Sequence, residues 1–135
     1  MAARVAADLA TRSGGDYRYV WITMGANDFG AVLTDETAWK ANMGGTLDAI
    51  HAAMPNALIY VAHPWCRGYD SQSASISAWV DTLVAARSPW AIAGPDESTY
   101  LKDGDNGTAL TSDGCHPNSG GYAAGAAAWQ SAMGR

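Results

Sequence analysis

The length, composition and charge of the chain indicate one acidic domain and exclude two classes of protein. The chain has 135 residues, 48% of them hydrophobic, which suits a single compact domain over residues 1–135. Eight basic against thirteen acidic residues give a net charge of −5, and no basic cluster offers the positive surface that nucleic acid requires. No apolar stretch reaches the roughly 18 to 20 residues of a membrane span, so we expect a soluble protein.

The N-terminal segment reads as a helix rather than as a targeting signal. The first ten residues include Asp8 and lack a continuous apolar stretch, so they do not resemble a secretory signal. The localisation stays open, and secretion remains an alternative because a signal can be removed from a mature protein. Residues 2–12 place apolar side chains at helical spacing before a Ser-Gly-Gly stop at 13–15, which predicts a first helix.

Short apolar segments alternate with helical patterns along the rest of the chain. The predicted elements are strands over 17–24, 57–62 and 90–93, helices over 34–54, 73–87 and 122–133, and a long loop over 94–121. Gly44 and Gly45 predict a bend within the helix over 34–54. The alternation predicts an α/β fold in which helices flank a parallel sheet. Because ligands bind at the carboxyl ends of such strands, the segments after Met24, Ala62 and Ala93 are expected to share one rim.

The aromatic residues divide between the predicted core and the predicted rim. Tryptophans on strand or helix faces are assigned to the core: Trp21, Trp39, Trp79 and Trp129. Aromatic residues in rim segments either flank a ligand or pack within the protein: Trp65, Tyr69 and Tyr100.

The strongest local pattern is Asp113-Gly114-Cys115-His116-Pro117, in which an aspartate precedes a histidine by three residues. A carboxylate at this spacing can accept the Nδ1 hydrogen of the imidazole, fix its tautomer and leave Nε2 as a general base. The alternative is a surface histidine that lies beside an aspartate by chance. The pattern alone does not separate the two.

A second pattern, Gly25-Ala26-Asn27-Asp28, directly follows the first predicted strand. Gly25 permits a sharp exit from the strand, and the Asn27 amide is a donor that can stabilise the oxyanion of an acyl-transfer intermediate. An ordinary Asn-Asp turn is the alternative, because both residue types favour turns.

Together the two patterns resemble the later part of the SGNH (GDSL-type) hydrolases, a family of serine esterases and lipases. They match its Gly-x-Asn-Asp and Asp-x-x-His blocks in the family's order, and the resemblance extends from about residue 17 to the C-terminus. It implies a three-layer α/β/α fold with a parallel sheet, a small-molecule ester substrate, an acyl-enzyme and no cofactor. It also implies that His116 is the general base, that Asp113 orients it and that Asn27, after the Gly25 turn, is an oxyanion donor.

The chain departs from the family at the nucleophile, because it has neither the Gly-Asp-Ser block nor the block that adds an oxyanion glycine. Ser13 lies at the start of a predicted strand, about 20 Å from its carboxyl end at roughly 3.3 Å per residue, and thus at the wrong rim. Serines and cysteines in segments expected at the correct rim stay open as nucleophiles: Ser71, Ser73, Cys66 and Cys115.

We interpret the chain as lacking the family's N-terminal strand or strands, either as a fragment or as a naturally short relative. The leading hypothesis is an esterase that uses a displaced nucleophile or an activated water. The alternative is a catalytically inactive fragment or a binding module. A missing strand also exposes a sheet edge, so self-association through that edge is expected.

The two cysteines allow three interpretations. Cys66 and Cys115 form a disulfide, remain thiols, or join His63 and His116 as zinc ligands. The disulfide ranks first because it needs only the two sulfurs. Residues 103–107 begin like an acidic calcium loop but offer glycine where a third side-chain ligand is needed, so we expect no metal.

Overall fold

The structure is a computed structural model that describes residue 7 and residues 17–30, 35–102 and 107–134. The elements in this part of the chain are β1 (Tyr19–Ile22), the 3-10 helix η1 (Ala26–Asp28), α2 (Glu36–Ala53), β2 (Leu58–His63), α3 (Asp70–Ala85), β3 (Ala91–Asp96), α4 (Ser98–Leu101) and α5 (Ser119–Ala132). The helix predicted over 2–12 (apart from residue 7), Ser13 and most of the calcium-like run over 103–107 lie outside the described residues.

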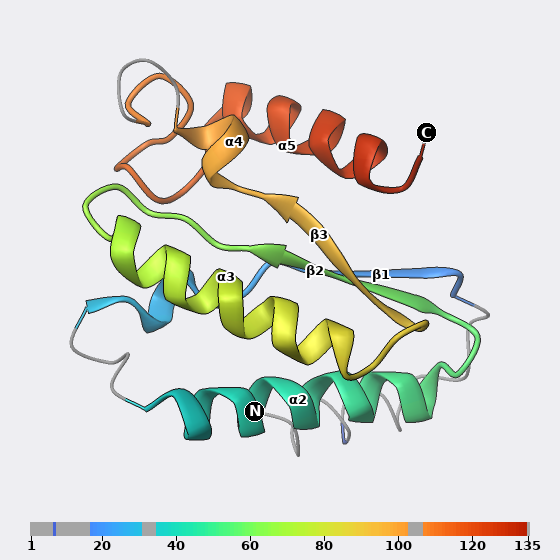
Figure 1. Cartoon of the computed structure of the whole chain (residues 1–135). Coiled ribbons are helices and arrows are strands. Elements are labelled where there is room, and N and C mark those ends of the chain that lie inside the picture. Colours follow the sequence, from blue (N-terminus) through green and yellow to red (C-terminus); the bar gives the residue numbers. More distant parts are fainter. Residues whose placement is uncertain (1–6, 8–16, 31–34, 103–106, 135) are drawn as a thin grey trace.

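The strands form a parallel sheet in the order β1-β2-β3, with Tyr19 opposite Leu58 and Ile59 opposite Ala91. Helices α2 and α3 cover one face of this sheet, and α5 covers the other (Figure 1). The described chain is therefore a three-layer α/β structure with a parallel sheet, and the predicted fold class is confirmed.

The central strand, β2, is buried on both faces because a helical layer lies against each. Ile59 and Val61 point into the larger core between the sheet and helices α2 and α3. Tyr60 and Ala62 point the other way, into a smaller core with Trp129 of α5. Alternate side chains of a strand face opposite sides of the sheet, and this explains why the sequence of β2 is apolar throughout.

Helix α2 continues through Gly44 and Gly45 as one α-helix instead of ending or restarting there. Gly44 is buried where the Arg87 side chain crosses the helix, and a Cβ at Gly44 would lie 2.7 Å from Arg87 Nη2. From there Arg87 donates two hydrogen bonds to the Asp48 carboxylate, at 2.8 and 2.9 Å. No helix within the described ranges combines the length and hydrophobicity that a bilayer crossing demands.

The loop predicted over 94–121 is wrong in its extent. Strand β3 continues to Asp96, α4 follows at once, and α5 already begins at Ser119. The side-chain oxygen of Asn118 accepts hydrogen bonds from the N–H groups of Gly120 and Gly121, so the helix starts ahead of both glycines. At the other end of the chain the strand predicted over 17–24 is shorter, because only Tyr19–Ile22 pairs with β2.

The prediction that Trp21 lies in the core is wrong. Trp21 is 53% exposed and stacks on Trp129, with 5.3 Å between ring centroids. Trp129 is buried in the smaller core, whereas Trp39 and Trp79 contact each other and pack partly buried against the larger one. Trp21 lies on β1, where its side chain is covered on one side only.

Replacing Ile76 by alanine tests the larger core. Ile76 lies on α3 and is fully buried against the sheet, so Ile76→Ala removes packed methyl groups and leaves a cavity. We expect the free energy of unfolding to fall by about 2–5 kcal/mol in urea denaturation followed by circular dichroism. The exposed neighbour provides a control, since Ser75→Ala should change stability by less than about 0.5 kcal/mol. Similar losses in both variants would contradict this packing.

Candidate active site

The segments that follow the three strands meet at one rim and enclose a cavity of about 400 Å³. Thr23 and Asn27 line it after β1, and Glu97 lines it after β3. His116 lines the cavity from the loop before α5, and Trp129 lines it from α5 itself. The structure therefore brings the two sequence patterns, which are far apart in the chain, to the same cavity.

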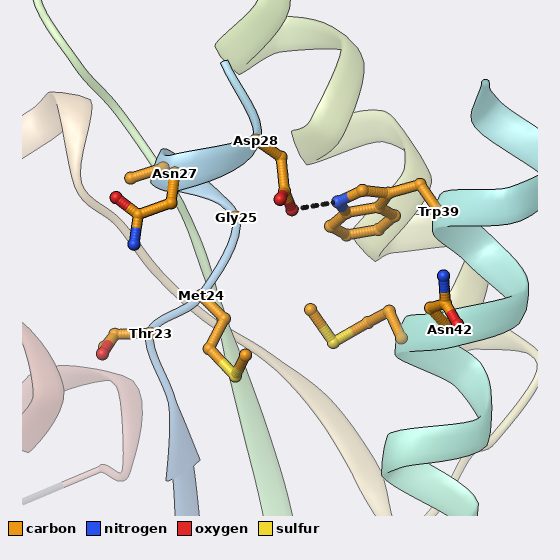
Figure 2. Close-up of a pocket in the computed structure, with 9 residues that line it drawn as sticks. Thr23, Met24, Gly25, Asn27, Asp28, Trp39 and Asn42 are labelled. Carbon is orange, nitrogen blue, oxygen red and sulfur yellow. Dashed lines mark hydrogen bonds between the residues drawn. The ribbon is translucent and has the colours of Figure 1, made fainter. Parts of the chain in front are cut away.

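The turn after β1 presents Asn27 because Gly25 takes a backbone conformation that other residues avoid. Gly25 has φ of +117°, and a Cβ there would lie 3.1 Å from Pro64 Cγ. The Asp28 carboxylate accepts a hydrogen bond from Trp39 Nε1 at 2.8 Å and so ties the turn to α2. Figure 2 shows the side chains of Asn27 and Asp28 pointing to opposite sides of the turn. Asp28 is thus structural, and Asn27 is left facing the rim.

A second cavity, of about 390 Å³, lies on the other side of the same turn (Figure 2). Thr23 and Asn27 line both cavities, and Asn42 of α2 lines this one. The carboxyl end of β1 is therefore open on two sides.

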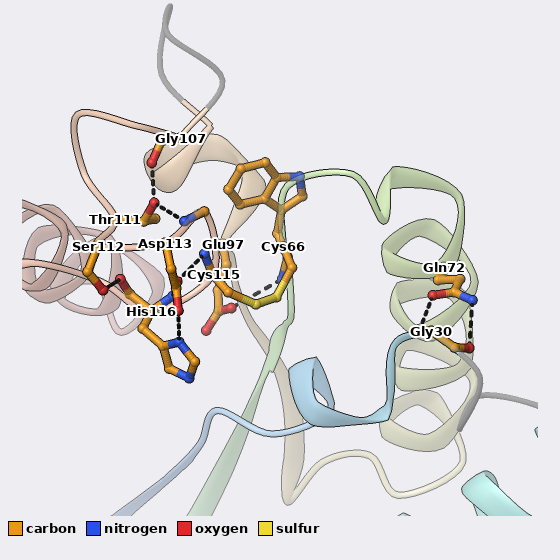
Figure 3. The surroundings of a disulfide bond; sticks show 12 residues. Gly30, Cys66, Gln72, Glu97, Gly107, Thr111, Ser112, Asp113, Cys115 and His116 are labelled. Carbon is orange, nitrogen blue, oxygen red and sulfur yellow. Dashed lines mark hydrogen bonds and ion pairs between the residues drawn. A yellow bond between two sulfur atoms is a disulfide. The ribbon is translucent and has the colours of Figure 1, made fainter.

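Asp113 and His116 form a hydrogen-bonded pair, with 2.7 Å between His116 Nδ1 and Asp113 Oδ2 (Figure 3). The other carboxylate oxygen accepts the backbone N–H groups of His116 at 2.8 Å and Cys115 at 2.9 Å. These hydrogen bonds hold the pKa of Asp113 well below its ordinary value. The His116 backbone N–H has the largest effect, followed by the His116 ring and the Cys115 backbone N–H. An ionised carboxylate only accepts, so in the neutral ring Nδ1 carries the hydrogen and Nε2 is the basic nitrogen.

The loop that carries this pair is attached to the segment after β2. The structure joins Cys66 and Cys115 in a disulfide, and Arg67 donates its backbone N–H to the Gly114 carbonyl at 2.8 Å. Gly114 has φ of +93°, and a Cβ at this position would lie 2.8 Å from Arg67 Nε. Within the loop, the Thr111 hydroxyl accepts the Gly114 N–H at 2.8 Å. Covalent and hydrogen-bonded links together place His116 over the rim.

The zinc site considered from the sequence is not assembled. The sulfurs of Cys66 and Cys115 are bonded to each other and are not free to bind a metal. His63 Nε2 lies 3.0 Å from Asp81 Oδ1 and so has a different partner. Within the ranges that the structure describes, no group of three or more histidine, cysteine or acidic side chains is placed to hold a metal ion.

The serine candidates do not line the cavity, whereas Cys115 does. Ser73 is buried on α3 and lines a separate cavity, and Ser71 is an exposed residue in the first turn of the same helix. Both thiols are consumed by the disulfide. Of the rim aromatics, Tyr100 lines the cavity, whereas Trp65 is 1% exposed and serves packing. Tyr69 is 42% exposed and stacks on a phenylalanine.

Glu97 is a cavity residue that sequence reasoning missed. Its Oε2 accepts the Trp65 backbone N–H at 3.2 Å. Burial raises the pKa of Glu97, the Trp65 hydrogen bond opposes this, and the nearby charge of Asp96 adds to the rise. Burial likewise raises the pKa of Tyr100. The available signal was position, because Glu97 belongs to the third rim segment that the sheet topology predicts.

The chain belongs to the GDSL-like lipase/acylhydrolase family, whose model matches residues 1–124. The resemblance read from the sequence is thereby confirmed. No curated protein matches the chain in sequence.

Solved structures share the fold at low identity. A protein from Streptococcus pneumonia, provisionally described as a platelet activating factor, is 18% identical with a TM-score of 0.73 and covers 97% of this chain and 67% of its own. A mutant acetyl esterase with acetate ion is 21% identical with a TM-score of 0.61, and the match covers 85% of this chain and 56% of the esterase. A carbohydrate esterase family 3 protein from Talaromyces cellulolyticus is 22% identical with a TM-score of 0.62, and the match covers 91% of this chain and 58% of that protein. This chain thus spans between about half and two thirds of these structures.

The titration of Asp113 tests the pair directly. We expect the carboxyl carbon of Asp113, followed by NMR, to titrate with a midpoint below the ordinary value of about 3.9. Because the pKa is lowered by folding, the carboxylate's contribution to stability is present above about pH 4 and is lost only as the pH falls through the lowered value. His116→Ala removes the ring hydrogen bond but keeps both backbone donors, so its midpoint should rise only partway. An ordinary midpoint in the unmodified chain would contradict the geometry.

Proposed function

We propose that this chain hydrolyses small carboxylic esters in the cavity between Asn27 and His116. The family of the chain is one of lipases and acylhydrolases, and two of the structures that share its fold are described as esterases. The observation that carries the proposal is that Asn27 and the Asp113–His116 pair line or border one cavity, although 85 or more residues separate them. An amide donor facing a histidine with a fixed tautomer is the pair of functions that acyl transfer needs.

The proposed reaction uses His116 as base and then as acid. His116 Nε2 takes a proton from the nucleophile while the oxygen of the nucleophile attacks the carbonyl carbon of the ester. The Asp113 carboxylate stabilises the resulting imidazolium. The carbonyl oxygen becomes an oxyanion that accepts a hydrogen bond from the Asn27 amide. The intermediate then collapses, the bond to the alkoxide breaks, and the alkoxide takes the proton from the imidazolium. With water as nucleophile the products are a carboxylic acid and an alcohol.

Water is the proposed nucleophile because the base is open to solvent. The His116 side chain is 70% exposed, so water reaches the imidazole from the mouth of the cavity. The hydroxyl groups on the described cavity wall belong to Thr23, Tyr100 and Tyr122. Among the described residues, none of these hydroxyl groups is hydrogen-bonded to a side chain that could act as its base. A phosphonate that labels serine esterases should therefore leave the intact mass unchanged while hydrolysis proceeds.

A binding module is the second candidate, favoured by the same cavity wall, where threonine and tyrosine supply the hydroxyl groups. Such a module would bind an ester and leave it intact. The two candidates differ in turnover, so one hydrolysis assay separates them.

Hydrolysis of 4-nitrophenyl acetate by single-site variants tests the proposed function. We expect His116→Ala to reduce the rate to that of buffer. We expect Asn27→Ala to lower kcat/KM about a hundredfold, the usual effect of removing one oxyanion donor. The Asn27 variant is the sharper test, because an exposed imidazole alone can attack this activated ester and Asn27→Ala leaves His116 in place.

Asn56→Ala is the matched control, since Asn56 is an exposed turn residue between α2 and β2. It should keep the full rate. Equal rates in the unmodified chain, Asn27→Ala and Asn56→Ala would remove Asn27 from the mechanism. A folded chain with no rate above buffer would instead favour the binding module.

Self-association through the sheet edge is also proposed. In the described part of the chain β1 pairs with β2 alone, and Trp21 on β1 is 53% exposed. We expect the sedimentation coefficient to rise with concentration, and Trp21→Lys to suppress the rise by placing a charge at the edge. Tyr69→Lys, at an exposed aromatic residue away from β1, should sediment like the unmodified chain. A coefficient independent of concentration would refute the association.

A further inference from the structure

Glu97 is a carboxyl group that the fold builds into the cavity wall and that the proposed hydrolysis does not use. It directly follows β3, and its backbone N–H donates to the His63 carbonyl at the end of β2, at 2.9 Å. Its side-chain Oε2 accepts the Trp65 backbone N–H at 3.2 Å. Two hydrogen bonds, one to the end of β2 and one to the segment after it, thus hold the residue in place. Figure 3 shows its carboxyl group beside the disulfide that anchors the His116 loop.

The surroundings of Glu97 combine apolar walls with the hydroxyl group of Tyr100. Tyr100 lies one turn along from Glu97 and lines the same cavity, and α5 approaches it so closely that a Cβ at Gly125 would lie 3.3 Å from the Tyr100 ring. Trp129 closes the cavity from α5. Small-molecule sites are typically apolar with a few polar groups that fix the orientation of the ligand. Here those groups are the carboxyl of Glu97 and the phenol of Tyr100, in addition to Asn27, the His116 imidazole and the hydroxyl groups of Thr23 and Tyr122.

Glu97 and Tyr100 suit a ligand that both donates and accepts hydrogen bonds. Burial raises the pKa of each group, so each holds its proton to higher pH than it would in water. The cavity wall in the described chain carries no lysine or arginine to neutralise an ionised Glu97. A hydroxyl group is the common ligand that satisfies such partners, because it donates to one oxygen and accepts from another.

We propose that Glu97 is a specificity-determining residue whose carboxyl group binds a hydroxyl group on the alcohol part of the ester. The preferred substrates are therefore esters of polyols rather than esters of simple alkyl alcohols. This inference rests on the proposed hydrolysis, which supplies the ester and its orientation between Asn27 and His116. A site built to bind a hydroxyl group discriminates against the analogue that lacks it, because its own polar groups are then left without a partner.

The test compares two acetates that differ only in hydroxyl groups, glycerol 1-acetate and propyl acetate. We expect the chain to hydrolyse glycerol 1-acetate with the higher kcat/KM. Glu97→Met keeps the length of the side chain and removes its hydrogen bonding, so the ratio of the two kcat/KM values should fall about tenfold, mainly through KM. Glu97→Gln keeps an oxygen for the Trp65 N–H and should give an intermediate ratio. Glu36→Gln, at a surface ion pair with Lys40, should leave the ratio unchanged.

A binding measurement separates failure of this inference from failure of the proposed function. The ether 3-ethoxypropane-1,2-diol resembles glycerol 1-acetate but has no ester bond, and it should shift the NMR signal of the Trp65 backbone amide in the unmodified chain but not in Glu97→Met. Shifts without hydrolysis of any ester would refute the function and, with it, the substrate preference, and would support only the binding of a hydroxyl group by Glu97. If all variants hydrolysed the esters with the same ratio of kcat/KM for glycerol 1-acetate and propyl acetate, the inference would be refuted and the proposed function would stand. A preference for acetylcholine over glycerol 1-acetate that Glu97→Met abolishes would also refute the inference, because the carboxylate would then recognise a cation.

Discussion

The candidate site exists because three paired strands run in the same direction. Parallel pairing brings the ends of β1, β2 and β3 to one rim, so Asn27, Pro64 and Glu97 become neighbours without being close in the chain. The register of the central strand is strongly specified, since a slip of one residue would turn Ile59 and Val61 from the α2–α3 side of the sheet toward α5. Packing on both faces of β2 therefore also fixes the geometry of the rim.

The His116 loop depends on a second set of interactions, which are local. Asp113 is exposed, yet three donors from two residues of its own loop, Cys115 and His116, surround its carboxylate and lower its pKa. The disulfide and the Arg67–Gly114 hydrogen bond then attach this preformed loop to the segment after β2. An exposed histidine is in this way held with a defined tautomer.

Sequence reasoning reached the features that depend on periodicity and on short spacing. The apolar run of β2 and the helical patterns of α2 and α3 determine the α/β layers, and the three-residue spacing from Asp113 to His116 determines a contact within one turn. The prediction failed where residues distant in the chain determine the environment of a side chain. Trp21 is 53% exposed on β1, Gly44 lies inside α2 where the Arg87 side chain crosses the helix, and Glu97 matters only through its place at the rim. None of these three outcomes has a local signal.

The proposed function requires that Asn27 and His116 face one ligand in one cavity. Titration of 15N-labelled protein with acetate, the acid product of an acetyl ester, measures this most directly. We expect the signals of the Asn27 side-chain amide and the His116 ring to shift together and to fit one dissociation constant, and the Asn56 signal to stay unchanged. Shifts of one group without the other, or different constants for the two, would contradict a shared site.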